Sequence, residues 1–416
     1  MAELSARDRA RAYWTYWAAS ATSNLGSAVT SVALPLTAIT VLDATPVEMG
    51  LVAAAGYAAW LVIGLPAGVI TQRLPLRGTQ VTLDLLRAAA LVSVPVAWWW
   101  DALTLAQLIG VALVISFADV LFDVSNLTFM PRVVPAEDLQ RRNSLNSGTH
   151  AVTQLGGPGL GGLLVQLLGA VPTLLVDAVS YLVSAALLRT LPAARVERPD
   201  AWPRIGAMIR EGFGYVVRHP VMGPCMWNAT AINFVCGAQF TLFPLYLVTV
   251  LDAPAGLVGV LLATEGVGAL VGAALTPWLS ERIGTARLDL AGNVVCLGGA
   301  LLLPWGTGST AYAAFALGNI AFAGGCVVGS VSTRTYRQTA SPPELLSRVL
   351  ATVRFVSWGA IPVGSIVAGL VAHEIGVRST LLVFGVLTVL GPATLWFSKV
   401  RTLRDFTDHD RELSRV

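Results

Sequence analysis

Charged side chains are scarce in this sequence, and their scarcity excludes a water-soluble protein. Asp, Glu, Lys and Arg make up 12% of the 416 residues, whereas hydrophobic residues make up 55%. Soluble domains carry a charge at about a quarter of their positions. The mean hydropathy of +0.69 points the same way. The chain is therefore expected to reside in a membrane.

Three further absences exclude other classes of protein. No CxxC spacing occurs, and all four cysteines fall in apolar runs: Cys225, Cys236, Cys296 and Cys326. This pattern indicates small buried side chains that form no disulfide and bind no metal. No GxxxxGK[ST] loop occurs, so ATP is not the direct energy source. The net charge of +3 comes from short loops and forms no basic patch, which excludes nucleic acid as a partner. No cofactor or metal is expected.

Long hydrophobic runs, by contrast, are abundant. About 20 apolar residues span the hydrocarbon core as a helix. The sequence contains twelve such runs: 13–41, 48–70, 79–99, 103–127, 144–169, 172–191, 221–250, 255–280, 286–304, 309–333, 347–373 and 377–398. A transmembrane β-barrel would instead show segments of about ten residues with alternating polarity. The predicted fold is an all-α integral membrane protein.

Basic residues predict the orientation of these helices. Arg and Lys accumulate in short loops on the cytoplasmic side of a membrane. Here they precede the first run and recur in every second loop, whereas the intervening segments "DATPVE", "LDAPAG" and "PWGTGSTAYA" contain none. Both termini are therefore expected in the cytoplasm.

The sequence also repeats itself. "VSNLTFMPRVVPAEDLQR" from Val124 aligns without gaps with "VSTRTYRQTASPPELLSR" from Val331, and each segment follows the fourth run of a set of six. The repeat predicts two six-helix bundles, and the apolar spacing between them predicts an interfacial helix. The expected parts are an N-terminal bundle at 1–191, a central cytoplasmic loop with that helix at 192–218, a C-terminal bundle at 219–399 and a cytoplasmic tail at 400–416.

Twelve spans in two parallel halves joined by a long central loop resemble the major facilitator superfamily of secondary transporters. Within it, "FDVSNLTFMPRVVPAEDLQRRNSLNS", "LLVDAVSYLVSAALL" and "REGFGYVVRHPVM" are similar to the bacterial exporter group that includes macrolide-efflux proteins and the enterobactin exporter. The resemblance implies a monomer in the bacterial cytoplasmic (inner) membrane. It also implies export of a small lipophilic molecule (a drug, secondary metabolite or siderophore) by alternating access, in exchange for protons.

The segment "GPGLGG" in the fifth run matches the GPxxGG core of the antiporter motif of drug exporters in this superfamily. The resemblance assigns the direction and gating of transport to Gly157, Pro158, Gly161 and Gly162. Thr153, Gly157 and Gly161 recur every four residues on one helical face, so a neighbouring helix can approach closely. Pro158 removes a backbone hydrogen bond and bends the helix. The alternative is ordinary packing of small residues.

The loop after the second run resembles the gating loop of the superfamily, with one change. Gln72 and Arg73 stand where the pattern has Asp-Arg, and Arg77 follows, whereas the second half keeps Glu281 and Arg282. The resemblance implies latches that hold the two bundles together on the cytoplasmic side. Further charges near that membrane face complete the predicted gating network: Asp84, Arg87, Asp123 and Arg354.

Charged groups deep in the membrane are costly and indicate function. Glu265 and Asp119 lie deeper than the others, so we expect Glu265, or else Asp119, to carry the coupling proton. Asp177 is expected to have a structural hydrogen-bonding role. Polar residues on helices that line the cavity in this superfamily are candidates for substrate contact: Asn24, Asn228, Asn233 and Gln239.

Two other functions stay open at this point. Asp119 and Asp123 form a DxxxD pattern on one helical face, which could hold Mg²⁺ for a diphosphate in an intramembrane prenyltransferase. The second half offers no second acidic cluster for such an enzyme. A lipid or lysolipid flippase on the same fold would share the features above, and only flux assays separate it from drug export.

Overall fold

The computed structural model describes residues 6–64, 66–67, 75–133, 139–191 and 205–408. In this part of the chain, twelve helices are long and apolar enough to cross a membrane, one in each predicted run. The described residues contain helices and turns and no strand. The predicted all-α membrane fold is confirmed.

The chain divides into two compact units. Unit 1 comprises Met1–Ala44, Ala58–Trp202 and Pro254–Val260, and unit 2 comprises Thr45–Tyr57, Pro203–Ala253 and Leu261–Val416. Each unit therefore contains most of one predicted bundle together with a short piece of a helix from the other half of the sequence.

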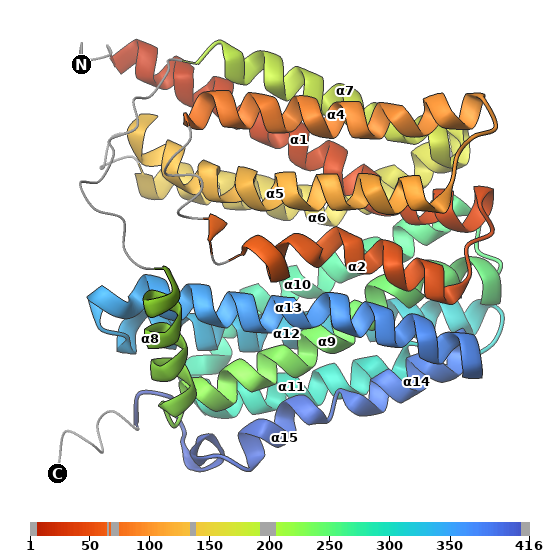
Figure 1. Ribbon diagram of the computed structural model, residues 1–416. Helices are drawn as coiled ribbons and strands as arrows, with labels where there is room; N and C mark the ends of the chain where they lie inside the picture. The colour runs from red at the N-terminus through yellow and green to blue at the C-terminus, as the bar shows by residue number, and fades with distance from the viewer. Residues whose placement is uncertain (1–5, 65, 68–74, 134–138, 192–204, 409–416) are drawn as a thin grey trace. The chain divides into compact units, whose positions relative to one another are not determined.

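Unit 1 contains five spanning helices and the second part of α2 (Pro46–Ile63). The five are α1 (Ala6–Val41), α4 (Leu76–Trp99), α5 (Leu105–Val133), α6 (Leu139–Leu168) and α7 (Ala170–Arg189). α1 packs against α6 and α7, and α4 packs against α5 and α7 (Figure 1). Tyr16, Leu83, Phe122 and Leu188 belong to a buried cluster that joins these helices. Polar side chains on the same helices, such as Asp84, Arg87 and Asp177, are therefore buried inside unit 1.

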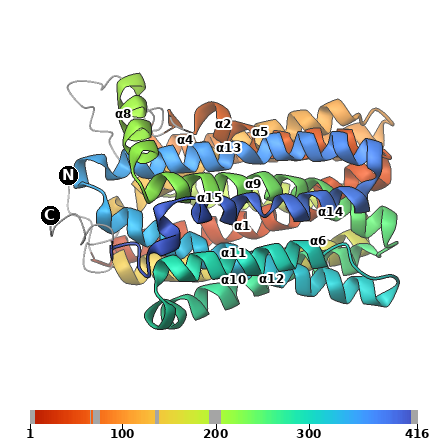
Figure 2. The same cartoon turned by 90° about the horizontal axis from the view of Figure 1, so that it is seen from below.

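Unit 2 follows the same plan with additions at both ends. Its elements are α8 (Ile205–Arg218), α9 (Met222–Leu245), the π-helical turn η1 (Tyr246–Val250), α10 (Ala255–Ile283), α11 (Thr285–Leu302), α12 (Ser309–Ala340), α13 (Pro343–Ile375), α14 (Val377–Leu387), α15 (Leu390–Trp396) and the 3₁₀ turn η2 (Lys399–Thr402). The unit also contains the first part of α2, and α10 belongs to it from Leu261 onward. α9 packs against α13, and α11 packs against α12 (Figure 2). The last predicted span is a single apolar run that the structure divides into α14 and α15.

The helix predicted in the central loop is present as α8. It runs across the ends of α9 and α13 (Figures 1 and 2). Val216 on its inner face is fully buried, Gly212 lies against α13, and Glu211 forms an ion pair with Arg348 of α13. One face of this amphipathic helix is therefore covered by protein, while Phe213 remains exposed.

Candidate transport site: a buried polar network

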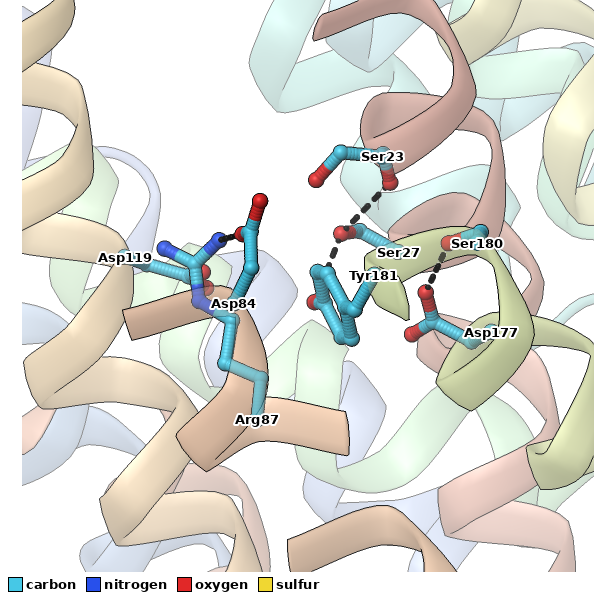
Figure 3. A network of polar contacts seen from close by, with 8 residues as sticks. All are labelled: Ser23, Ser27, Asp84, Arg87, Asp119, Asp177, Ser180 and Tyr181. Atoms are coloured by element: carbon cyan, nitrogen blue, oxygen red, sulfur yellow. Dashed lines mark hydrogen bonds and ion pairs between the residues drawn. The ribbon is translucent and has the colours of Figure 1, made fainter. Parts of the chain in front are cut away.

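A network of polar side chains lies inside unit 1, where α1, α4, α5 and α7 meet (Figure 3). In "TLDLLRAA", α4 carries Asp84 and Arg87 three residues apart, so both side chains project from one helical face. Arg87 Nη1 donates to Asp84 Oδ1 at 3.2 Å. The two side chains are only 2% and 0% exposed, respectively. The pair is therefore a buried ion pair formed within one helix.

Arg87 also reaches the neighbouring helix. Its Nη2 lies 2.9 Å from Oδ1 of Asp119 on α5, and its guanidinium carbon lies over the rings of Phe122 at 4.7 Å and Tyr181 at 5.2 Å. Two carboxylates and two aromatic faces thus offset the cost of burying this cation. The Asp119 side chain is 45% exposed, which makes it the accessible member of the trio.

Asp177 on α7 forms a second group next to the trio. Thr30 Oγ1 of α1 donates to Oδ2 of Asp177 at 2.5 Å, and Ser180 Oγ donates to Oδ1 at 2.8 Å. A Cβ added at Gly26 of α1 would collide with Asp177 and Ser180, so glycine is what allows α1 to approach this carboxylate. These are hydrogen bonds of the kind expected for Asp177 from its sequence.

Tyr181 connects the two groups, because it lies one turn beyond Asp177 and its ring faces Arg87. Ser27 Oγ donates to the carbonyl oxygen of Ser23 at 3.0 Å, so the Tyr181 hydroxyl, 2.9 Å from Ser27 Oγ, is the donor in that contact. The hydroxyl therefore binds α1 while the ring covers the arginine of α4, as Figure 3 shows.

The glycines of the predicted antiporter motif lie at close helix contacts within unit 1. A Cβ added at Gly157 would collide with Ala28 of α1, and one at Gly161 would lie 3.1 Å from the backbone of Val29. At Gly162 it would lie 2.7 Å from Gly259 Cα, in the first turns of α10. Close approach at this face of α6 is therefore present in the structure.

The two proton-coupling candidates lie in different units and in different surroundings. Asp119 is ion-paired with Arg87, as described above. Glu265 on α10 is exposed and, within the described part of the chain, has neither a hydrogen bond nor an ion pair. Its carboxylate lies within electrostatic range of the thiols of Cys236 on α9 and Cys326 on α12.

The candidates for substrate contact fall into two pairs. Asn24 is half-buried, and Asn233 donates from Nδ2 to the carbonyl oxygen of Ala229 in its own helix at 2.8 Å. Asn228 and Gln239 are each 6% exposed, and Asn228 Oδ1 and Gln239 Nε2 have no hydrogen-bond partner. The second pair therefore lies in the protein interior.

The predicted gating residues are distributed over several places. The structure joins Asp84 and Arg87 to Asp119, which the sequence analysis had put in a separate group. Arg77 donates from Nη1 to the carbonyl oxygen of Leu191 at 2.6 Å. The ion-paired trio of Asp84, Arg87 and Asp119 and the contact of Arg77 are therefore separate interactions.

The remaining gating candidates have other surroundings. Arg282 lies 4.1 Å from the ring centre of Trp278, and Arg354 lies 4.6 Å from that of Trp358, each within its own helix. Asp123 and Glu281 are exposed. Gln72 and Arg73 lie outside the described residues.

One buried carboxylate was missed from the sequence. Asp289 on α11 is 0% exposed and lies in the tripeptide Leu-Asp-Leu, as does Asp84 on α4. The two tripeptides lie in the third spanning helix of each half, at 83–85 in α4 and 288–290 in α11. The repeated tripeptide was the signal that could have revealed Asp289.

The twelve apolar helices of the described residues define a class of protein, a polytopic membrane protein. The profile of the transmembrane secretion effectors matches residues 6–413, and the chain belongs to this family of the major facilitator superfamily. It is a transporter and not an enzyme, so the prenyltransferase alternative is set aside.

Sequence relatives agree with the family assignment, and solved structures share the fold. The multidrug efflux pump Tap of Mycolicibacterium fortuitum is 27% identical over 402 residues, which cover 92% of this chain and 95% of Tap. The MFS-type transporter YfiS of Bacillus subtilis is 24% identical and covers 94% of each chain. The nucleoside transporter NupG shares the fold with a TM-score of 0.78 at 13% identity, over 92% of this chain and 98% of NupG. A bacterial homologue of ferroportin has a TM-score of 0.72 at 17% identity, over 93% and 98%.

Proposed function

We propose that the protein exports a small lipophilic compound across the bacterial cytoplasmic membrane in exchange for protons. The observation that carries the proposal is the similarity to the efflux pump Tap, which extends over nearly the whole of both chains. In this proposal the protein acts as a monomer with both termini in the cytoplasm, and its two halves give alternating access to a central cavity.

The energy for export would come from an ion gradient, since the sequence has no GxxxxGK[ST] loop for ATP. A proton that falls through roughly 100 to 200 mV releases about 2 to 5 kcal/mol. That free energy supports a concentration ratio of about fifty to two thousand for the exported compound.

The charges of the buried network are suited to such coupling. Asp84 and Asp119 share the single cation of Arg87, so the trio carries one uncompensated negative charge when both carboxylates are ionised. A proton taken up at the accessible Asp119 removes that charge and leaves Arg87 paired with Asp84. Asp119 is therefore a chemically reasonable carrier.

Glu265 is the other candidate, and we place it first because of its position in the middle of α10. An exposed carboxylate without an ion pair can exchange its proton without breaking other contacts. The glycines of α6 would set the direction and gating of transport through their close contacts, and the charged residues near the cytoplasmic ends of the helices would form the latches.

Substrate-driven proton flux in proteoliposomes tests the proposal. The panel comprises wild type, Glu265→Gln and Asp119→Asn, with Glu374→Gln and Asp101→Asn as matched controls at exposed positions. Lipophilic antibiotics serve as cargo, and a labelled lysolipid serves as the test for a flippase. We expect drug-driven proton flux in wild type and both controls, with loss of flux in Glu265→Gln or Asp119→Asn. Full coupled export in both variants would remove both residues as carriers, and transport of the lysolipid alone would reject drug export.

A further inference from the structure

Asp289 of unit 2 lies in a polar cluster to which neither the proposed export nor the sequence analysis gives a role. Asn293, one turn further along α11, donates from Nδ2 to Oδ1 of Asp289 at 3.2 Å. A Cβ added at Gly329 of α12 would collide with the same oxygen, so the backbone of α12 presses directly on the carboxylate. The carboxylate of α11 therefore lies in direct contact with α12.

The hydrogen bonding of this cluster is incomplete. Oδ2 of Asp289 accepts no hydrogen bond, and Nε and Nη1 of Arg337 on α12 donate none. Both side chains are buried, at 0% and 8% exposure, and they lie within electrostatic range of each other. Yet Asp289 and Arg337, both within the described residues, form no ion pair within 4.0 Å. Each group therefore has unused hydrogen-bonding atoms that fit the other.

Ionisation of a buried carboxylate that lacks an ion pair and a full set of hydrogen bonds is unfavourable. Removing an ion from water costs several kcal/mol unless a counter-ion and hydrogen bonds replace the lost hydration. A proton on Oδ2 removes the charge and turns an empty acceptor into a donor. Two amide oxygens lie beside Gly391 in the same region of unit 2: Oδ1 of Asn228, which has no hydrogen-bond partner, and Oδ1 of Asn293.

We propose that Asp289 is a proton-binding site in which a proton and Arg337 compete for the same carboxylate oxygen. With the proton on Oδ2, Arg337 stays unpaired, as in the structure. When the proton is released to water, Nε and Nη1 of Arg337 donate to Oδ2. The pair then changes from a net charge of +1 to zero, so proton release is coupled to a movement of the Arg337 side chain at the end of α12.

The charged and titratable groups around Asp289 allow this exchange. α12 contributes Arg337, with Arg334 beyond it, and α9 contributes the buried thiol of Cys225. The C-terminal segment places Asp405 at the first residue of α11, one turn away. α15 has no titratable side chain, and Arg378, the charged residue of α14, is held by the carbonyl oxygens of Pro304 and Gly306 near the far end of α11. Arg287 of α11 and the η2 residues Lys399 and Arg401, which lie on an element packed against α11, are exposed. Arg337 is thus the buried cation placed to replace the proton.

Proton binding at Asp289 can be measured without any cargo, whereas a role for it in transport rests on the proposed proton exchange. The measurement is the infrared carbonyl band of protonated carboxylic acids in the purified full-length protein, recorded over a range of pH in H₂O and D₂O. The panel comprises wild type, Asp289→Asn, Arg337→Gln and Arg337→Lys, with Asp101→Asn as a control at an exposed loop position.

We expect one component of the band to be lost in Asp289→Asn and kept in Asp101→Asn. That component should persist to higher pH in Arg337→Gln, where the ionised carboxylate has lost its partner, and should return toward wild-type behaviour in Arg337→Lys. An unchanged band in Asp289→Asn, or the same pH response in Arg337→Gln as in wild type, would overturn the proposal. If Asp289→Asn does not fold, the comparison of Arg337→Gln with Arg337→Lys decides. Failure of proton-coupled export in proteoliposomes leaves this result unaffected.

Discussion

The tripeptide Leu-Asp-Leu occurs in α4 of unit 1 and in α11 of unit 2, and its carboxylate meets different counter-charges in the two places. Asp84 is paired with Arg87 of its own helix at 3.2 Å. Asp289 has Gly292 where α4 has Arg87, and the cation within electrostatic range, Arg337, comes from another helix without forming an ion pair. The same tripeptide thus carries a buried acid in both units, with a different cation near it in each.

Glycine in place of arginine changes the packing as well as the charge. A Cβ added at Gly292 would lie 3.0 Å from the carbonyl oxygen of Gly325 on α12, so the two backbones approach closely there. In unit 1 the corresponding space holds the Arg87 side chain, its ion pairs and two aromatic rings. Unit 1 stabilises this region through charge, whereas unit 2 stabilises it through backbone contact and leaves its carboxylate open to a proton.

Replacing Arg87 or Arg337 tests this difference between the units, and the expected change in stability is the largest of those predicted. Arg87→Met leaves Asp84 and Asp119 without their cation, and breaking a buried pair in this way costs about 3 to 5 kcal/mol. Arg337→Met removes a buried charge that forms no ion pair in the structure, so its cost should be below about 1 kcal/mol. Thermal unfolding of the purified variants in detergent measures both.

The comparison fails if the two variants lose equal stability, because Arg337 would then be paired in the resting protein. Arg77→Met provides a reference for the loss of an arginine that contacts only a backbone carbonyl, that of Leu191. The loss of stability in Arg77→Met should lie between the losses in Arg87→Met and Arg337→Met.

Substitutions at the glycines of α6 and α13 are expected to have effects of intermediate size on stability. Gly157 of α6 packs against Ala28 of α1, and Gly364 of α13 packs against the backbone of Phe234 on α9. Leucine at either position overpacks a helix contact, which costs about 1 to 3 kcal/mol. Export should be lost in Gly157→Leu while membrane insertion stays intact, as measured by drug accumulation and by the amount of protein in membranes.

Gly156 provides the control for this experiment. A Cβ at Gly156 meets no atom within 4 Å, so Gly156→Leu should retain export. If Gly157→Leu also retains export, the motif is ordinary packing. If Gly364→Leu fails in the same way as Gly157→Leu, the two halves use equivalent contacts for gating.

The sequence predicted the parts of this protein that depend on local pattern. The lengths of the hydrophobic runs located all twelve spanning helices. The positions of charged residues within these runs assigned Asp84 and Arg87 to the gating network and made Asp119 a proton-coupling candidate. Spacing alone places Asp84 and Arg87 on one face, because both belong to α4. The contact from Arg87 to Asp119 depends on how α4 packs against α5, and a single sequence does not specify that packing.

Contacts between distant segments were beyond prediction for the same reason. Thr30 donates to Asp177 across 147 positions, and Gly26 is needed because α7 brings Ser180 and Asp177 against it. Asp177 stands out as a charge in an apolar run, but nothing in their own segments marks Thr30, Gly26 or Ser180 as its partners. Asp289 is different, since its tripeptide copies that of Asp84 and a search for shorter repeats would have found it.

The starts of α4 and α11 provide the smallest test of the comparison. α4 begins after Pro75 without a side-chain cap. α11 begins at Thr285, whose backbone N–H donates to Oδ1 of Asp405 in the C-terminal segment at 2.9 Å, and Phe406 N donates back to Thr285 Oγ1 at 3.0 Å. Gly284 has a φ of +89°, and a Cβ there would collide with Arg404. The tail therefore docks closely on this helix start.

Asp405→Ala removes the acceptor at the start of α11 and should cost about 1 kcal/mol, the usual value of a lost helix cap. Asp405→Asn keeps an acceptor oxygen and should lose much less, because a cap bond to an amide oxygen survives. Hydrogen exchange of the amides at 285–288 gives the local readout, and thermal unfolding gives the global one. Faster exchange in Asp405→Ala than in Asp405→Asn is expected at these amides, with no change at the start of α4. Equal exchange in both variants and wild type would show that the burial of Phe406, which is 1% exposed, holds the tail without help from the cap.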